Sequence, residues 1–265
     1  MTIHEQMNLV GRVALITGGA GHVGRMAAET LAELGAHIII LDSDKNASEK
    51  AAQLIQDKYA VQSVAIAVDL EDPHFLDQVM PIIEEQFGRL DILMNNAAFT
   101  GASNLKGWVA DFKEQRVDTW RRALEVNLTA PFALIQSCVD LLKATKGVVI
   151  NIGSIYGVLG PDMSLYEGGS LGNPAAYAAS KGGLLQLTRW LATVLAPDIR
   201  VNMISPGGIF RHQPKDFCER YIKKTPLKRM ATEEDLKGAI AYFATDLSLY
   251  VTGQNLLVDG GWAAW

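Results

Sequence analysis

Tyr177 and Lys181 lie four residues apart in the stretch NPAAYAASKGGLLQLTRWLATVLA. Residues at this spacing share one face of an α-helix, so the phenol and the ammonium would be neighbours. A nearby cation stabilises a phenolate, lowers the pKa of the tyrosine and makes it a usable acid or base near neutrality. Asn173 and Pro174 are typical of a helix N-cap and first turn. Alone, the pattern is also compatible with an ordinary surface tyrosine and lysine.

A glycine loop, TGGAGHVG, follows the apolar run VALIT and precedes a segment with helical spacing from residue 23 to 34. A strand, a tight turn and a helix place free N–H groups and a positive helix terminus against a pyrophosphate. Glycine is required where a Cβ would hold the backbone away from the phosphates. Gly18, Gly21 and Gly24 therefore predict a dinucleotide site, with a glycine turn that binds nothing as the alternative.

Asp42 ends the next apolar run, HIIILD. A carboxylate there can accept hydrogen bonds from the ribose hydroxyls of adenosine, and it would repel the 2′-phosphate of NADP. Ser43 follows it where an NADP site would have a cation, so we expect NAD as the cofactor. Arg25 and Lys45 keep NADP as the alternative, and a helix N-cap is the non-ligand interpretation of Asp42.

The elements that must position these residues are seven apolar runs, separated by amphipathic segments. Unbroken apolar strands that alternate with helices are typical of a parallel sheet covered on both faces. We therefore predict an α/β fold of the Rossmann type, with a doubly wound, seven-stranded parallel sheet and helices on both faces. No repeat or linker divides residues 1–265, so we expect a single domain. The strands are expected at residues 13–17, 37–42, 63–69, 89–97, 147–154, 199–208 and 255–261.

Composition narrows the function class. The formal net charge of -5 argues against a nucleic-acid binder, so the expected partners are small molecules. Only two cysteines occur, Cys138 and Cys218, without disulfide or metal spacing, so we expect a reducing compartment and no metal site. No secretory signal and no apolar run near the ~18 residues of a membrane span is present, which predicts a soluble, cytoplasmic protein without membrane contacts.

Taken together, the motifs resemble the short-chain dehydrogenase/reductase family. NNAA at residues 95–98, VNLTAPF around Asn127, INIGS ending at Ser154, YAASK and SPGGI follow the glycine loop in the family's order, and TGQNLLVDGG lies near the end. The resemblance covers nearly the whole chain. It implies a classical, nicotinamide-dependent oxidoreductase that interconverts a secondary alcohol and a ketone.

The resemblance also implies a catalytic tetrad of Asn127, Ser154, Tyr177 and Lys181. Tyr177 would exchange a proton with the substrate oxygen, which Ser154 would hold and polarise. Lys181 would lower the pKa of Tyr177 and hold the nicotinamide ribose, and Asn127 would position a water that links Lys181 to solvent. Such prearranged donors stabilise the charge that hydride transfer leaves on one oxygen.

For the cofactor, the resemblance places Asp69 near the adenine, Asn95 near the adenosine half, and Pro206 with Gly207 near the nicotinamide. The full set of cofactor-binding residues that it implies is Gly18, Gly21, His22, Val23, Gly24, Asp42, Asp69, Leu70, Asn95, Ala97, Tyr177, Lys181, Pro206, Gly207 and Ile209.

Two residues depart from the family pattern. His22 stands where the classical branch usually has glycine, which gives the TGxxGxxG spacing of the extended, epimerase-like branch. Extended members usually carry a longer region after VDGG, so we expect a classical enzyme with a variant turn and His22 on the phosphate side. Arg211 replaces a threonine often found after the PG motif. With His212, it could meet the cofactor pyrophosphate or an anionic substrate, or form a salt bridge to a neighbouring loop.

The substrate side is expected in three segments, at about residues 99–118, 155–173 and 208–230. The first two are longer than usual in the family and should emerge at the carboxyl ends of strands. Within the third, residues 212–230 are interpreted as a mobile loop whose closure excludes water. Residues that could line the pocket or else pack the loops are Trp108, Tyr156, Tyr166 and Glu167.

The polar, tyrosine-rich second segment favours a sugar, polyol or sugar-derived acid over a steroid or fatty-acyl chain. The sequence also resembles bacterial members of surface-sugar pathways, including flagellin glycan and nonulosonate biosynthesis. The alternatives are an NAD-retaining epimerase or dehydratase and a non-catalytic dinucleotide sensor. Family members are commonly dimers or tetramers, and we expect a homotetramer that uses the helices around Asn127 and Tyr177 and the C-terminal strand. It would also cover the tail GWAAW.

Overall fold

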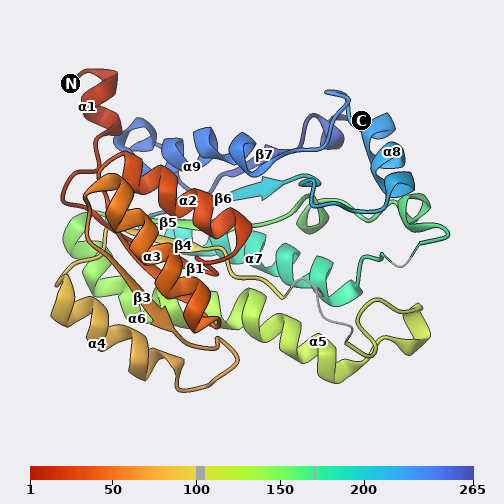
Figure 1. The fold of residues 1–265 in the computed structure, drawn as a ribbon, viewed down its shortest axis with the longest axis horizontal. Helices are drawn as coiled ribbons and strands as arrows, with labels where there is room; N and C mark the ends of the chain where they lie inside the picture. The colour runs from red at the N-terminus through yellow and green to blue at the C-terminus, as the bar shows by residue number, and fades with distance from the viewer. Residues whose placement is uncertain (100–104, 170) are drawn as a thin grey trace.

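The computed structural model describes residues 1–99, 105–169 and 171–265. At its centre lies a parallel sheet of seven strands in the order β3-β2-β1-β4-β5-β6-β7, which confirms the predicted fold class (Figure 1). From β1 near the centre of the sheet, the strands follow one another outward to β3 at one edge. The chain then crosses to β4 on the other side of β1 and continues to β7 at the opposite edge. The strands are β1 (Val13–Thr17), β2 (His37–Asp42), β3 (Ser63–Ala67), β4 (Ile92–Asn95), β5 (Val148–Ile152), β6 (Arg200–Pro206) and β7 (Asn255–Val258).

Helices connect the strands. They are α1 (Ile3–Met7), α2 (His22–Glu33), α3 (Lys45–Tyr59), α4 (Phe75–Gln86), α5 (Val117–Leu124), α6 (Ala130–Thr145), α7 (Ala175–Val194), α8 (Lys215–Lys224) and α9 (Lys237–Ala244). The shorter turns are η1 (Phe112–Glu114), η2 (Glu125–Thr129), η3 (Ile155–Gly157), η4 (Met163–Tyr166), η5 (Glu233–Leu236), η6 (Asp246–Ser248) and η7 (Trp262–Ala264). None of the helices in the described ranges is long and apolar enough to span a membrane.

The two faces of the sheet bury alternate residues of each strand. In β1, Ala14 and Ile16 pack with apolar residues of α2, α3 and α9. Val13 and Leu15 pack on the opposite face with residues of α4, α6 and α7. Because successive side chains of a strand point to opposite faces, a continuous apolar run fills both layers. This double burial explains why the strands could be recognised without an alternating pattern.

Several strands are shorter than the apolar runs that predicted them. The run at 89–97 contributes only Ile92–Asn95 to β4. Asp91, just before the strand, accepts a hydrogen bond from the Val13 N–H at 2.8 Å and also binds the guanidinium of Arg89. Residues 89–91, which were expected to be part of the strand, therefore lie before β4 and fix the position of its start.

Helix α7 begins one residue later than the capping pattern predicts. Pro174 occupies the N-cap position, and no side chain caps the helix there, so the prediction that Asn173 is the N-cap is wrong. The Ala175 N–H donates instead to Oε1 of Gln115, at 3.1 Å. The partner comes from a distant segment, which is why the local sequence gave no indication of it.

The segment at 208–230 is not one loop. It contains α8, a helix of ten residues, which lies near the C-terminus of the chain (Figure 1). Arg220 of this helix donates two hydrogen bonds to the Leu165 carbonyl, at 3.1 and 2.9 Å, and joins α8 to the segment at 155–173. Residues 100–104 and 170, which fall within two of the expected substrate segments, lie outside the described residues.

Candidate active site

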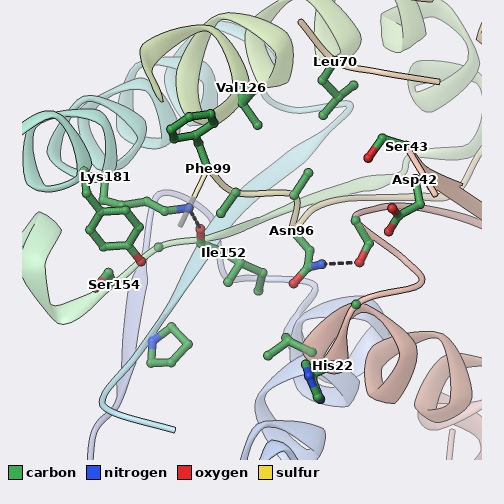
Figure 2. A pocket seen from close by; sticks show the side chains of 18 of the residues that line it. His22, Asp42, Ser43, Leu70, Asn96, Phe99, Val126, Ile152, Ser154 and Lys181 are labelled. Carbon is green, nitrogen blue, oxygen red and sulfur yellow. Dashed lines mark hydrogen bonds between the residues drawn. The ribbon is translucent and has the colours of Figure 1, made fainter. Parts of the chain in front are cut away.

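A cleft of about 590 Å³ opens where β2, β4, β5 and β6 end (Figure 2). In a doubly wound sheet, this is the crevice created where the strand order reverses beside β1. The expected site residues that line it are Gly18, Gly21, His22, Val23, Asp42, Asp69, Leu70, Ala97, Ser154, Tyr177, Lys181, Pro206, Gly207 and Ile209. Gly24, Asn95 and Asn127 do not line it.

The glycine loop combines a turn that needs positive φ with a close packing contact. Gly18 has φ +60°, and a Cβ there would lie 2.8 Å from the Cα of Ala97. A Cβ on Gly24 would lie 2.1 Å from the Gly18 carbonyl oxygen, so Gly24 allows the helix to approach the loop and does not face the cleft. Gly21 is the N-cap of α2 and provides no capping side chain. The unsatisfied N–H groups of this helix terminus fit an anion such as a pyrophosphate.

Asp42 lies at the end of β2 and faces the cleft (Figure 2). One carboxylate oxygen accepts a hydrogen bond from the Ala20 N–H at 3.1 Å, and the other accepts one from the Asp44 N–H at 3.1 Å. The N-cap of α3 is Asp44, whose side chain accepts from Ala47, so Asp42 does not cap that helix. Each oxygen keeps a further lone pair that could accept from a ribose hydroxyl.

Ser154, Tyr177 and Lys181 meet at the opposite end of the cleft from Asp42. The ammonium of Lys181 lies 5.9 Å from the centre of the Tyr177 ring and donates to the Ile152 carbonyl at 2.8 Å (Figure 2). Burial lowers the pKa of Lys181 to about 8. Burial also raises the pKa of Tyr177, against the opposing effects of its hydrogen bond with Ser154 and of the positive charge of Arg211. The expected lowering of the tyrosine pKa by Lys181 is therefore not the dominant effect in this structure.

Asn127 lies behind this group in a π-helical turn, η2, between α5 and α6. It is fully buried, and its amide donates to the Ser180 hydroxyl at 2.9 Å. Its carbonyl oxygen accepts from the Phe99 N–H at 2.6 Å. A π-turn widens a helix locally and is frequent at functional sites. Here the π-turn directs the Asn127 amide into the protein interior. The hydrogen bonds of this amide link α7 to the segment after β4.

The structure gives the two asparagines of NNAA different positions. Asn95 is the last residue of β4, and its amide donates to the side chain of Asn151 on β5 at 2.8 Å. Asn96 reaches the cleft instead, and its amide donates to the Gly18 carbonyl at 3.0 Å (Figure 2). The expectation that Asn95 contacts the adenosine half is not supported by this geometry, because its side chain is buried between strands.

Arg211 lines the cleft and forms an ion pair with Glu233, with 3.1 Å between Nε and the carboxylate. Of the alternatives given for Arg211, the salt bridge to a neighbouring loop is therefore present. The Arg211 side chain nevertheless also borders the cleft. His22, the first residue of α2, is exposed and also faces Glu233, with Nδ1 4.0 Å from the same carboxylate oxygen.

The four candidates for the substrate pocket do not line the cleft. Trp108 is buried and packs edge-on against Phe99, with ring centres 5.0 Å apart. The hydroxyl groups of Tyr156 and Tyr166 are hydrogen-bonded to each other at 2.8 Å. Trp108, Tyr166 and Glu167 border a second cavity, of about 820 Å³, between the two long segments.

Some cleft residues were not predicted from the sequence, and four of them, Ser43, Val68, Asn96 and Gly153, follow directly after a strand. Such positions could have been found by taking every residue that immediately follows an expected strand, because carboxyl ends of parallel strands meet at one edge. The additional lining residues are Leu41, Ser43, Val68, Glu71, Asn96, Ala98, Phe99, Val126, Ile152, Gly153 and Gln213.

Comparison with known proteins agrees with this geometry. A family model described as enoyl-(acyl carrier protein) reductase matches residues 18–263. The chain is 33% identical over 261 residues to the 3-oxoacyl-[acyl-carrier-protein] reductase FabG of Escherichia coli (strain K12), covering 96% of this chain and 98% of that protein. It is 34% identical over 257 residues to the trans-4-hydroxycyclohexanecarboxylate dehydrogenase of Sinomonas cyclohexanicum, covering 94% and 92%.

Among solved structures, a protein of Beutenbergia cavernae provisionally described as an NAD(P)-dependent gluconate 5-dehydrogenase, with bound NADP, has a TM-score of 0.83 and 31% identity. The match covers 98% of this chain and 100% of that chain. The chain therefore belongs to the short-chain dehydrogenase/reductase family. The expected class, an oxidoreductase that acts on alcohol and ketone groups, is confirmed.

Proposed function

We propose that this protein is an NAD-dependent dehydrogenase that interconverts a secondary alcohol and a ketone on a sugar, a polyol or a sugar-derived acid. The observation that carries the proposal is the shared cleft. It has Ser154, Tyr177 and Lys181 at one end and Asp42 beyond the glycine loop at the other. A cleft with acid–base groups at one end and a ribose acceptor at the other fits a dinucleotide that reacts with a bound alcohol.

In this proposal NAD, when bound, supplies the acceptor for hydride. Tyr177 takes the hydroxyl proton of the alcohol, and Ser154 holds the same oxygen. Lys181, which is charged below its pKa of about 8, stabilises the phenolate and holds the nicotinamide ribose. Asn127, which is hydrogen-bonded to Ser180 and Phe99 behind this group, positions a water that links Lys181 to solvent. These fixed groups stabilise the charge that develops on one oxygen.

The preference for NAD rests on Asp42. Its carboxylate would lie close to a 2′-phosphate, and like charges repel. Neither of the cations that kept NADP open, Arg25 and Lys45, lines the cleft. Lys45 instead lies 3.8 Å from Glu49 on the same helix. Because the relative from Beutenbergia cavernae binds NADP, titrations with NADH and NADPH should be compared directly, and we expect NADH to bind more tightly.

A polar, acidic substrate is supported by two of the relatives. One is named as a hydroxycyclohexanecarboxylate dehydrogenase and the other as a gluconate dehydrogenase, so both names contain a hydroxy acid. We include sugar acids of bacterial surface-glycan pathways in this class, and we assign the substrate side to the segments at 99–118, 155–173 and 208–230.

A second candidate is the reduction of a 3-oxoacyl thioester. It is favoured by the 33% identity to FabG over 96% of the chain. A non-catalytic dinucleotide sensor is less compatible with a complete tetrad. Only the glycine spacing favours an NAD-retaining epimerase or dehydratase. Net reduction of NAD by a free hydroxy acid separates the leading proposal from all three.

The proposal is tested by screening free, phosphorylated and nucleotide-linked sugars, polyols, cyclic hydroxy acids and a 3-oxoacyl thioester. Absorbance of the reduced cofactor provides the readout. Tyr177→Phe should reduce kcat by at least about 100-fold, the usual lower range for loss of a general acid–base group. NADH binding should stay near the wild-type value, and Tyr250→Phe, which changes a fully exposed tyrosine, should leave both unchanged. Full activity in Tyr177→Phe would refute the catalytic assignment.

We further propose a cytoplasmic homotetramer formed by one continuous domain, residues 1–265. The interface would use α5, α6 and α7 together with β7. Exposed apolar side chains on these elements support this assembly, including Trp190 and Val194 on α7 and Leu256 on β7.

A further inference from the structure

The two residues that depart from the family pattern meet at one carboxylate. Oε1 of Glu233 lies 3.1 Å from Nε of Arg211 and 4.0 Å from Nδ1 of His22. The three residues come from separate elements, because His22 begins α2, Arg211 follows β6 and Glu233 begins η5. Glu233 therefore connects the helix terminus on one wall of the cleft to the segment on the other wall.

This junction places the Arg211 guanidinium near the N-terminus of α2. Arg211 and His22 both line the cleft, and both lie within 4.0 Å of the same oxygen. The N-terminus of a helix carries a partial positive charge and unpaired N–H groups. Positive groups on both walls therefore face the part of the cleft where an anion would lie.

The Arg211 backbone is also held in place. Its backbone N–H donates to Oε1 of Gln213 at 2.7 Å, and Nε2 of Gln213 donates to the Ile209 carbonyl at 2.7 Å. Only Nε of the guanidinium contacts Glu233. Within residues 1–99, 105–169 and 171–265, the two terminal nitrogens have no hydrogen-bond partner. A guanidinium held through Nε can present those two nitrogens together to two oxygens of one anion.

We propose that Arg211 binds the pyrophosphate of the dinucleotide from the wall opposite the N-terminus of α2, with Glu233 as its positioning residue. The inference rests on the proposed dinucleotide function. A substrate carboxylate is the other anion that Arg211 could bind. The shared contact with Glu233 favours the pyrophosphate, because it keeps the guanidinium near His22 and the helix terminus. The positive charge of Arg211 also opposes the raised pKa of Tyr177, so the guanidinium is within electrostatic reach of the phenol as well.

The test compares ligands that share or lack the pyrophosphate, using isothermal titration of ADP-ribose, NADH and adenosine. In Arg211→Gln, affinity for ADP-ribose and NADH should fall by about ten-fold or more, in line with loss of a charge-assisted hydrogen bond. Any measurable adenosine binding should be unchanged. Arg211→Lys should give an intermediate loss, because it keeps the charge but not the planar fork.

Arg229→Gln is the matched control. Arg229 also pairs with a carboxylate, Asp235, at 2.6 Å, but it does not line the cleft. Its loss removes the same charge from the chain, and ADP-ribose affinity should change by less than about two-fold, as for a screened surface charge. Wild-type affinity for ADP-ribose should also weaken with added salt more steeply than that of Arg211→Gln.

Two outcomes would overturn the inference. One is wild-type affinity for ADP-ribose in Arg211→Gln together with a raised KM for a carboxylate substrate, which would assign Arg211 to the substrate. The other is an equal loss in Arg229→Gln, which would indicate only a long-range charge effect. If the wild-type protein bound ADP-ribose through Arg211 but reduced no NAD with any alcohol, the proposed dehydrogenase function would fail and the pyrophosphate contact would stand.

Discussion

Lys181 is a charged side chain in an almost water-free position. It is 2% exposed, and its ammonium donates to one backbone carbonyl, that of Ile152. Burial penalises the charged form of a lysine and lowers its pKa, here to about 8. The side chain is therefore placed where it can act on Tyr177 and a ribose, and this placement reduces the stability of the protein below the pKa of the lysine.

The pH dependence of stability should reveal this placement. Between about pH 8 and the ordinary lysine pKa of 10.5, the unfolded chain holds a proton that the folded chain has released. The unfolded state then binds more protons, so the free energy of unfolding attributable to Lys181 increases with pH. Relative to Lys181→Met, the wild-type value should rise by about 1–2 kcal/mol from pH 8 to pH 10.

Urea denaturation of both cofactor-free proteins at several pH values measures this difference. Buried groups away from Lys181, such as Cys138, whose pKa is also raised, titrate in both proteins and cancel in the comparison. Parallel curves for wild type and Lys181→Met would show that the lysine keeps its ordinary pKa in the folded protein.

At the level of elements, α8 supports the wall of the cleft that includes Gly207 and Ile209, through a contact with Gly208 between them. The Gly208 N–H donates to the Tyr221 hydroxyl at 2.5 Å. A Cβ on Gly208 would lie 2.7 Å from the Tyr221 ring, so glycine permits this close approach. The ring also stacks on Trp262, with centres 4.4 Å apart. Helix α8 thus connects the C-terminal turn to the segment expected to meet the nicotinamide.

Tyr221→Phe should show whether this support matters for the cofactor. The ring would still pack, but the Gly208 N–H would lose its acceptor, a change of about 1–2 kcal/mol for a partly buried group. NADH affinity should fall several-fold, while ADP-ribose, which lacks the nicotinamide, should bind as it does to wild type.

A lower melting temperature with unchanged NADH affinity would limit Tyr221 to a structural role. Tyr242→Phe, at a more exposed tyrosine on α9, provides the control for loss of a phenolic hydroxyl.

For the whole molecule, the exposed apolar side chains of α7 suggest contact with other copies. Trp190 and Val194 are each 53% exposed on this helix. Clusters of exposed apolar groups commonly mark interaction surfaces. The same helix carries Tyr177 and Lys181, so an interface along it would also restrict movement of the proposed catalytic pair.

Light scattering should give a mass four times that of the chain. Trp190→Glu should shift the protein to smaller species, because a buried interface would then contain an unpaired charge. Leu54→Glu changes a side chain that is 51% exposed on α3, away from the proposed interface, and should leave the mass unchanged. A monomeric wild-type protein at micromolar concentration would refute the tetramer.

The amino-acid sequence alone predicted the strands, because the central strands β1, β4, β5 and β6 are continuous apolar runs that are buried on both faces. The edge strands β3 and β7 are only partly buried. The sequence also predicted that motifs at the ends of strands would meet at the cleft, including those of Gly18, Asp42 and Ser154. The pair Tyr177 and Lys181 was predictable for a related reason, since helical spacing is a local property of the chain.

The tertiary structure decided the contacts between residues far apart in the chain. It separated Asn95, which bonds to β5, from Asn96, which reaches the cleft. It replaced the expected cap of α7 with Gln115. It also brought Arg211 and His22 to Glu233. The local spacing of residues indicates helix or strand propensity and burial. These pairings depend instead on how the loops after different strands meet, and only the packed sheet brings those loops together.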